Sequence, residues 1–347
     1  MSVHITGIQQ VGIGVVDADQ AKYLYRNLFG MDVLVFDDEA EAKLMTRYTG
    51  NQSYKRRAIL TMNLKGGGGF EIWQYLDRTP VTLPKYSIWG APGINAVKIK
   101  TSCIHTARKK LTSYPALKIS PIHTSPNQGS SFTVTDHISH TFQIVEGVDW
   151  FKNNSTCLGG VAGVVIGVSN MERSLLFYKQ LLGNVYTVLD ITESIIHNGK
   201  EQTVRKVLLR KHIANTGAFS RLLGGFDIEL IQSLDEQAPH LFQNRYWGDC
   251  GFIHVCFDVL NMDGLKQTME QNGYPFTVDS AGSYAMENAS GRFCYVEDPD
   301  GTLIELVQTD RVPVIKKLGW YIHLSNRTHQ KPLPNWQVSM LGLNKVK

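Results

Sequence analysis

Three strand-like segments in the second half of the chain decide the fold: Gly225-Phe-Asp-Ile-Glu-Leu-Ile-Gln232, Gly251-Phe-Ile-His-Val-Cys-Phe-Asp-Val259 and Asp298-Pro-Asp-Gly-Thr-Leu-Ile-Glu-Leu-Val307. Each is rich in β-branched and aromatic residues, which is typical of strands. Side chains alternate between the faces of a strand, and one metal-ligating side chain stands out in each segment. These side chains are Glu229, His254 and Glu305. If their faces line one groove, two carboxylates and an imidazole converge, which is a plausible ligand set for a divalent metal.

The chain contains two copies of a strand followed by a helix. Residues 5–15 alternate as a strand, Asp17 then supplies a helix N-cap close to a capping box, and Gly30 ends the helix. The second copy begins with the strand at residues 163–168, and Ser169 is the predicted N-cap. The repetition indicates an internally duplicated fold.

Each half divides again into two modules. Glu71 precedes Ala96 by 25 residues, and Glu229 precedes His254 by the same interval. This spacing places corresponding strands of the two halves in one register. It predicts four modules in two domains, joined by a polar stretch at residues 147–160.

The predicted domains are residues 1–150 and 151–310, followed by a basic C-terminal extension at residues 311–347. The extension contains seven Lys or Arg residues and no Asp or Glu, although the net charge of the whole chain is only +4. We interpret it as a segment that packs back on the more acidic remainder of the chain. No nucleic-acid-binding motif accompanies it, so nucleic acid is not an expected partner.

Composition is that of an ordinary globular protein: 347 residues, 43% hydrophobic and 19% charged. No signal peptide and no apolar run of membrane-spanning length is visible, so no membrane partner is expected. Five cysteines without a Cys-x-x-Cys pair favour a reduced, cytoplasmic protein. The expected partner is a small-molecule substrate, and assembly as a homo-oligomer is left open.

The order of these features resembles the vicinal oxygen chelate superfamily, which includes glyoxalase I, methylmalonyl-CoA epimerase and the extradiol dioxygenases. The resemblance rests on the helix with Phe177-Tyr178, its Leu182-Gly183 end and the late Asp298-Pro-Asp-Gly turn before Glu305. It covers residues 5–310. It implies an α+β fold in which four βαβββ modules pair into two half-open, glyoxalase-like β-barrels. The metal ligands of that superfamily come from the first and fourth strands of each module.

Carried over by position, the resemblance gives the two predicted domains different ligand sets. The first domain holds Gln10, Glu71, Ala96 and Gln143. Gln10 and Glu71 match glyoxalase I, but the other two positions have lost their ligands, so we interpret this site as eroded. The second domain holds Gly163, Glu229, His254 and Glu305. The predicted metal ligands are therefore Glu229, His254 and Glu305, binding Fe, Mn, Co, Ni or Zn as a divalent ion.

The resemblance favours a metal-dependent lyase or isomerase of the glyoxalase or epimerase type. In this hypothesis a carboxylate removes a proton next to the vicinal oxygens of a chelated substrate, and Glu305 and Glu229 are the candidates. An extradiol-type dioxygenase is the second hypothesis, since Tyr295 matches that family's tyrosine, but Gly163 stands where a second histidine is required. A metal-free protein that binds small molecules, of the bleomycin-resistance kind, is the third.

Overall fold

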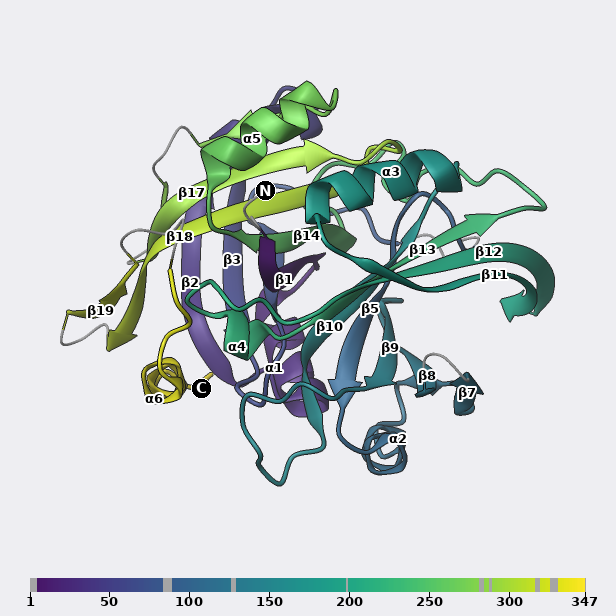
Figure 1. Ribbon diagram of the computed structural model, residues 1–347, viewed down its shortest axis with the longest axis horizontal. Coiled ribbons are helices and arrows are strands. Elements are labelled where there is room, and N and C mark those ends of the chain that lie inside the picture. Colours follow the sequence, from purple (N-terminus) through teal and green to yellow (C-terminus); the bar gives the residue numbers. More distant parts are fainter. Residues whose placement is uncertain are drawn as a thin grey trace.

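The computed structural model describes residues 5–83, 89–125, 129–197, 199–280, 284–286, 289–315, 319–324 and 330–346. Within these ranges the chain forms four modules, numbered here in chain order, and their strands build two curled sheets. The sheets lie side by side in Figure 1, sheet A to the left and sheet B to the right. The predicted α+β fold of four paired modules is confirmed.

Sheet A combines the first and fourth modules and, with β19 (Trp320–His323) beside β18 (Leu303–Ile315), has ten strands among the described residues. The first module consists of β1 (Ile5–Gly14), α1 (Ala18–Phe29), β2 (Val33–Glu41), β3 (Lys55–Met62) and β4 (Gly69–Tyr75). The fourth consists of β14 (Gly251–Val259), α5 (Met262–Gln271), β15 (Val278–Asp279), β16 (Tyr284–Met286), β17 (Ala289–Glu297) and β18 (Leu303–Ile315). The antiparallel pairing of β1 with β14 joins the two modules.

Sheet B combines the second and third modules and has nine strands among the described residues. The second module consists of β5 (Gly93–Thr101), α2 (Ile104–Thr112), β6 (Lys118–Ile119), β7 (His123–Ser125), β8 (Gly129–Thr135) and β9 (Thr141–Glu146). The third consists of β10 (Leu158–Gly167), α3 (Met171–Leu182), β11 (Tyr186–His197), β12 (Lys200–Lys211), α4 (Ser220–Leu223) and β13 (Phe226–Ser233). Here β10 pairs with β5.

This pairing corrects the expectation that each barrel is built from modules adjacent in sequence. Both sheets cross the predicted division near residue 150, because the first module pairs with the fourth and the second with the third. The first strand of a module has an open edge of unpaired N–H and C=O groups. In the first module this edge of β1 pairs with β14, which lies more than 200 residues away in the chain.

Modules that are adjacent in sequence still contact one another through their helices. In α1, the Tyr25 ring packs edge-on against Phe70 of sheet A, with 5.2 Å between the ring centroids. The Phe29 ring packs against Phe142 of sheet B, with 4.8 Å between the centroids. The Tyr25 hydroxyl donates to Asp136 Oδ2 of the second module at 3.1 Å. A corresponding bond links Tyr178 of α3 to Asp298 of the fourth module at 2.9 Å. The helices therefore connect the two sheets.

The helix caps agree with the sequence in one copy and differ by one residue in the other. Asp17 accepts a hydrogen bond from the backbone N–H of Gln20 at 2.9 Å, as predicted. In α3 the N-cap is Asn170 rather than Ser169. Both the backbone N–H and the hydroxyl of Ser169 bind the Asp300 carboxylate instead, which takes this serine away from the helix end.

The basic extension folds back on the first module. After β18 the chain forms β19 (Trp320–His323) and α6 (Asn335–Ser339), while residues 316–318, 325–329 and 347 lie outside the described ranges. Near its end, the backbone of Asn344 accepts a hydrogen bond from Leu34 N at 2.9 Å, and Val346 N donates to Asp32 O at 2.9 Å. In the described part of the chain, no helix is long and apolar enough to cross a bilayer.

Candidate metal centre

Two neighbouring rows of residues carry the candidate site on one face of sheet A. In one row Gly12 of β1 lies opposite His254 of β14 and next to Glu71 of β4. In the other, Gln10 lies opposite Cys256, which in turn pairs with Glu305 of β18. Positions two residues apart on a strand share a face, so the polar side chains of both rows point to the same side. They are Gln10, Glu71, His254 and Glu305.

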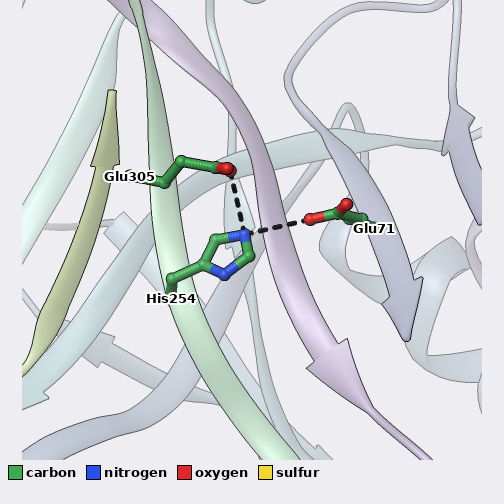
Figure 2. Close-up of side chains that lie close together, drawn as sticks. All are labelled: Glu71, His254 and Glu305. Carbon is green, nitrogen blue, oxygen red and sulfur yellow. Dashed lines mark ion pairs between the residues drawn. The ribbon is translucent and has the colours of Figure 1, made fainter. Parts of the chain in front are cut away.

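The imidazole of His254 lies between two carboxylates (Figure 2). Its Nε2 is 3.2 Å from Glu71 Oε2 and 3.1 Å from Glu305 Oε2. One ligand atom from each of the three residues lies within 4.8 Å of the others. His254 is fully buried, and Glu71 and Glu305 are 4% and 7% exposed. Two carboxylates and one imidazole nitrogen so close together form a donor set that suits a divalent transition metal.

Two buried polar atoms at this site have no hydrogen-bond partner among the described residues. They are Nε2 of His254, whose contacts with the carboxylates lack hydrogen-bond geometry, and Oε1 of Gln10. The amide nitrogen of Gln10 donates to Glu305 Oε2 at 3.4 Å, so its oxygen remains available. Buried polar atoms are rarely left without a partner. A cation held by Gln10, Glu71, His254 and Glu305 would satisfy both atoms, so these residues fit a bound metal ion.

Gly12 provides the space that the His254 ring occupies. A Cβ atom at this position would lie 2.4 Å from Cε1 and 2.7 Å from both ring nitrogens of His254. Any larger residue at position 12 would therefore displace the imidazole. The glycine is needed here because the ring lies directly over the neighbouring strand.

Tyr295 of β17 contacts two of the clustered residues through its hydroxyl group. Its hydroxyl donates to Glu305 Oε1 at 3.1 Å and lies 3.4 Å from Nδ1 of His254. Burial, and then the charges of Glu305 and Glu71, raise the pKa of Tyr295 well above its ordinary value. The hydroxyl therefore stays protonated and acts as a donor.

Without a metal, the charges of Glu71, His254 and Glu305 determine which of these groups are protonated. Burial lowers the pKa of His254, but the Glu305 and Glu71 carboxylates outweigh burial and raise that pKa to about 10. Burial raises the pKa of Glu305, but the His254 charge and the hydrogen bonds around it bring that pKa below its ordinary value. The metal-free site therefore holds an imidazolium between two carboxylates. A metal ion would replace the proton on His254.

Sheet B contains the remaining predicted ligand, Glu229, in a different environment. The carboxylate of Glu229 on β13 accepts a 2.6 Å bond from the Lys98 ammonium of β5, and both side chains are buried. The prediction that Glu229 joins His254 and Glu305 is thus corrected, because Glu229 belongs to the third module and His254 to the fourth. Their modules lie in different sheets.

The other positions of sheet B also exclude a metal site. Gly163 of β10 lies so close to β13 that a Cβ would be 2.2 Å from the backbone oxygen of Asp227. Val165, two residues on, occupies the place that Gly12 has in sheet A, and Ala96 occupies that of His254. No imidazole reaches the centre of sheet B in the part of the chain that the structure describes.

A cavity of about 210 Å³ opens onto the candidate site. Its walls include Glu71 and Glu305, the aromatic side chains Trp73, Trp247, Phe293 and Tyr295, and the segment Ala40–Met45 together with Arg56. A larger cavity of about 580 Å³ lies on another side of Trp247 and contains none of the three clustered residues. A third cavity, of only about 50 Å³, borders Gln10, Glu71 and Glu305. The cavity of about 210 Å³ is therefore the larger of the two that reach the candidate site.

Sequence reasoning missed Gln10 and Glu71 as partners of His254 and Glu305. The sequence did contain a signal for this grouping. Combining the ligand positions of the first and fourth modules gives a complete set of four side chains that can bind a metal. The second and third modules together give Gly163, Glu229, Ala96 and Gln143, with no histidine. Lys98 and Arg56 lie in no recognisable motif, so their positions beside Glu229 and in the cavity could be found only from the structure.

Known proteins support this fold. Residues 163–295 match the family model described as "Glyoxalase/Bleomycin resistance protein/Dioxygenase superfamily". Glyoxalase I from Zea mays has a similar structure, with a TM-score of 0.55 and 13% sequence identity over 88% of this chain and 93% of that one. A point mutant of the same enzyme gives a TM-score of 0.54 and 14% identity over 88% and 94%. Among curated proteins, no sequence matches the chain.

At such low identity, the structural similarity establishes the architecture alone. The architecture, the matched segment and the modular repeat agree with the resemblance found in the sequence. Residues 163–295 therefore match the glyoxalase, bleomycin-resistance and dioxygenase superfamily, and the chain shares the architecture of glyoxalase I.

Proposed function

We propose that the protein is a metal-dependent lyase or isomerase of the glyoxalase or epimerase type. The observation that carries this proposal is the convergence of His254 Nε2 with the carboxylates of Glu71 and Glu305 at 3.2 and 3.1 Å. The unpartnered oxygen of Gln10 adds a fourth ligand. The name of the structurally similar protein, glyoxalase I, lends further support.

A divalent ion held by Gln10, Glu71, His254 and Glu305 would polarise two vicinal oxygens of a substrate and so acidify the neighbouring C–H bond. The residues of the chain then move the proton. A carboxylate removes it from carbon, the electron pair of the C–H bond moves towards the substrate oxygen, and the same carboxylate returns the proton to a carbon. Atoms and charges balance without an oxidant or reductant.

Glu71 is better suited than Glu305 to carry this proton. Tyr295 binds one oxygen of Glu305, and the Gln10 amide binds the other. Among the described residues, Glu71 has only the contact with His254. Since a general base must have an oxygen free to accept a proton, we assign that role to Glu71 in addition to its role as a ligand, whereas Glu305, fixed by Tyr295, serves as a ligand only.

The cluster fits the two alternative functions, a dioxygenase and a metal-free binding protein, less well. An extradiol-type dioxygenase of the kind considered above needs two histidines and one carboxylate, whereas this cluster contains one histidine, two carboxylates and an amide. A metal-free binding protein would hold His254 as an imidazolium between Glu71 and Glu305 and would leave Gln10 Oε1 without a partner among the described residues. Both observations favour the lyase or isomerase, and the metal content of the purified protein separates it from a binding protein.

Hydrogen–deuterium exchange tests the proposal. The protein is incubated in D2O with 2-oxo acids, α-hydroxy ketones and acyl-CoA thioesters, with and without added Zn2+, Mn2+, Co2+ or Ni2+, and exchange at carbon is followed by proton NMR. We expect metal-dependent exchange for at least one class, lost in Glu71→Gln and kept in Glu229→Gln. Exchange that is independent of metal, or unchanged in Glu71→Gln, would overturn the proposal.

A further inference from the structure

Arg56 brings a positive charge to the cavity of the candidate site. It lies on β3, is 7% exposed, and lines the same cavity as Glu71 and Glu305. On β3, Leu60 pairs with Glu71, whereas Arg56 pairs with Tyr75 four residues further along the cavity. At about 3.3 Å per residue, the backbone of Arg56 is roughly 13 Å from the Glu71 row.

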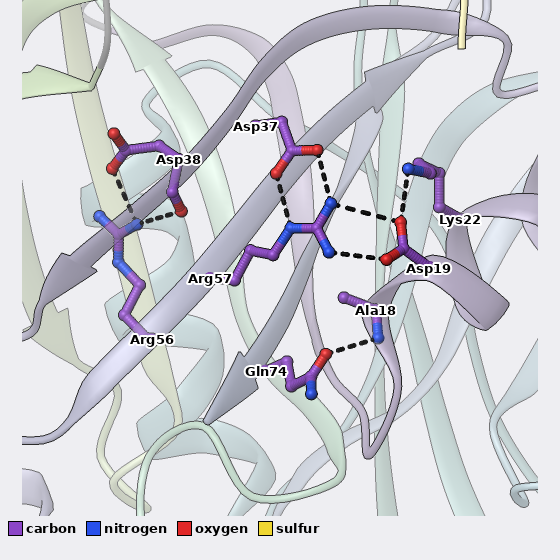
Figure 3. A network of polar contacts seen from close by, with 8 residues as sticks. All are labelled: Ala18, Asp19, Lys22, Asp37, Asp38, Arg56, Arg57 and Gln74. Carbon is purple, nitrogen blue, oxygen red and sulfur yellow. Dashed lines mark hydrogen bonds and ion pairs between the residues drawn. The ribbon is translucent and has the colours of Figure 1, made fainter. Parts of the chain in front are cut away.

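The guanidinium of Arg56 is only partly engaged. Its Nη1 donates to the backbone oxygen of Asp38 at 2.8 Å and to Asp38 Oδ2 at 2.9 Å (Figure 3). Neither Nε nor Nη2 donates a hydrogen bond to any residue that the structure describes. Those two N–H groups form one edge of the guanidinium, which matches the two oxygens of a carboxylate. Arg56 thus keeps the edge suited to a planar anion free.

No other buried cation lines this cavity among the described residues. Lys43 also lines the cavity, but its side chain is 75% exposed, and its Nζ lies 3.6 Å from Glu41 Oε2. The remaining wall consists largely of aromatic rings, from Trp73, Trp247, Phe293 and Tyr295. The cavity therefore combines a candidate metal centre, an aromatic wall and one buried guanidinium.

We propose that Arg56 binds a carboxylate of the substrate through its Nε and Nη2 edge. This inference rests on the function proposed above and specifies its substrate class. The substrate is a small acid with its vicinal oxygens at the end of the cavity formed by Glu71 and Glu305. A flat or aromatic middle lies along the Trp73 and Trp247 rings, and a separate carboxylate at the other end meets Arg56.

The next residue in the chain offers a matched control. Arg57 points to the opposite face of β3, where its Nε and Nη2 bind the Asp37 carboxylate at 2.7 and 2.8 Å. Its Nη1 binds Asp19 of α1 at 2.8 Å, as Figure 3 shows. All three nitrogens are engaged, and Arg57 lies outside the cavity. A variant of Arg57 removes the same charge from the same strand without touching the proposed contact.

The test compares 3,4-dihydroxybenzoate with its methyl ester, which differs in charge but hardly in shape. Both probes carry vicinal oxygens opposite the group that changes. Binding is measured by calorimetry under anaerobic conditions, with and without Zn2+, for the wild type, Arg56→Gln, Arg56→Lys and Arg57→Gln. Circular dichroism establishes that each variant is folded.

We expect the wild type to bind the acid about 10- to 100-fold more tightly than the ester, the range for a charge-assisted bidentate contact. Arg56→Gln should abolish that preference and leave ester binding unchanged. Arg56→Lys should retain part of it, and Arg57→Gln all of it. Equal binding of acid and ester by the wild type, a preference that survives in Arg56→Gln, or no binding of the acid would each overturn the inference.

The effect of Zn2+ separates this inference from the proposed function. The metal-dependent function predicts that Zn2+ tightens the binding of both probes. An acid preference without any gain from Zn2+ would contradict the metal-dependent function and support the role of Arg56. A gain from Zn2+ without an acid preference would support the metal-dependent function and contradict the role of Arg56.

Discussion

Sheets A and B place different chemistry at equivalent positions of the same fold. Sheet A has Gln10, Glu71, His254 and Glu305 at these positions, and sheet B has Gly163, Glu229, Ala96 and Gln143. Where sheet A has Cys256, sheet B has Lys98, whose ammonium lies 2.6 Å from Glu229. Sheet B thus has a cation of its own beside its carboxylate. Sheet A has two carboxylates and an imidazole, which a metal ion would complete.

The difference teaches that the positive partner of the carboxylates at the centre of each sheet decides what the site can bind. A side-chain ammonium gives a closed ion pair in which no position is open to substrate. A metal ion can bind substrate oxygens as well as protein ligands. In the proposed function, sheet B is therefore structural and sheet A holds the metal centre.

The largest expected effect comes from removing the internal cation of sheet B. Lys98→Met leaves the buried Glu229 carboxylate without a partner, and we expect the free energy of unfolding to fall by about 3–5 kcal/mol. Urea denaturation measures this loss. Replacing both residues, as Lys98→Met with Glu229→Leu, should recover most of the stability. A single variant as stable as the wild type would refute the pairing.

A second lysine on the same strand sharpens this comparison. Lys100 donates to the backbone oxygen of Asp149 but to no carboxylate, and burial lowers its pKa to about 8 against a weaker opposing effect of Asp149. Between pH 8 and 10.5 the unfolded chain binds this proton and the folded chain does not, so stability should rise with pH there. Lys100→Met should remove about 1–3 kcal/mol of that rise, measured by urea denaturation at several pH values. The same pH slope in both proteins would contradict it.

Placing alanine at the equivalent central position of each sheet, Gly12 in sheet A and Val165 in sheet B, tests whether the His254 position depends on Gly12. In Gly12→Ala the new methyl group would overlap the His254 ring. We expect metal affinity to fall by about 10- to 100-fold, as when a residue that orients a ligand is lost. Val165→Ala, at the equivalent position of sheet B, removes side-chain atoms far from His254 and should leave metal affinity unchanged. Calorimetric titration with Zn2+ distinguishes the two, and equal affinities would show that Gly12 is dispensable.

The smallest expected effect concerns Tyr295, the hydrogen-bond donor to Glu305. Tyr295→Phe keeps the ring and removes the hydroxyl, so Glu305 loses one of its anchors. We expect kcat for the exchange reaction to fall about 10-fold, the lower end of the effect of such supporting residues, with little change in KM. Loss of all activity would indicate that Tyr295 itself transfers the proton.

The strands and their register could be predicted from the sequence, because they follow from local patterns. The 25-residue spacing correctly aligned Glu71 with Glu229 and Ala96 with His254 as equivalent positions. The pairing of the modules could not be read in this way. It depends on hydrogen bonds between β1 and β14, and no local pattern in either strand specifies its distant partner.

Two features of the site could therefore be identified only from the structure. Assigning ligands by adjacency in the sequence placed Glu229 with His254, whereas the sheet places Glu71 there. The role of Arg56 depends on which of its nitrogens Asp38 occupies, and this follows from the geometry of two neighbouring strands.

The most direct test of the central claim, that the first and fourth modules together form the metal centre, is Zn2+ binding to two matched variants. Glu71→Gln and Glu229→Gln make the same chemical change at equivalent positions of sheets A and B. Calorimetry should show about one Zn2+ bound by the wild type and by Glu229→Gln, and an affinity at least about 10-fold lower in Glu71→Gln. Loss of binding in Glu229→Gln with full binding in Glu71→Gln would contradict the account.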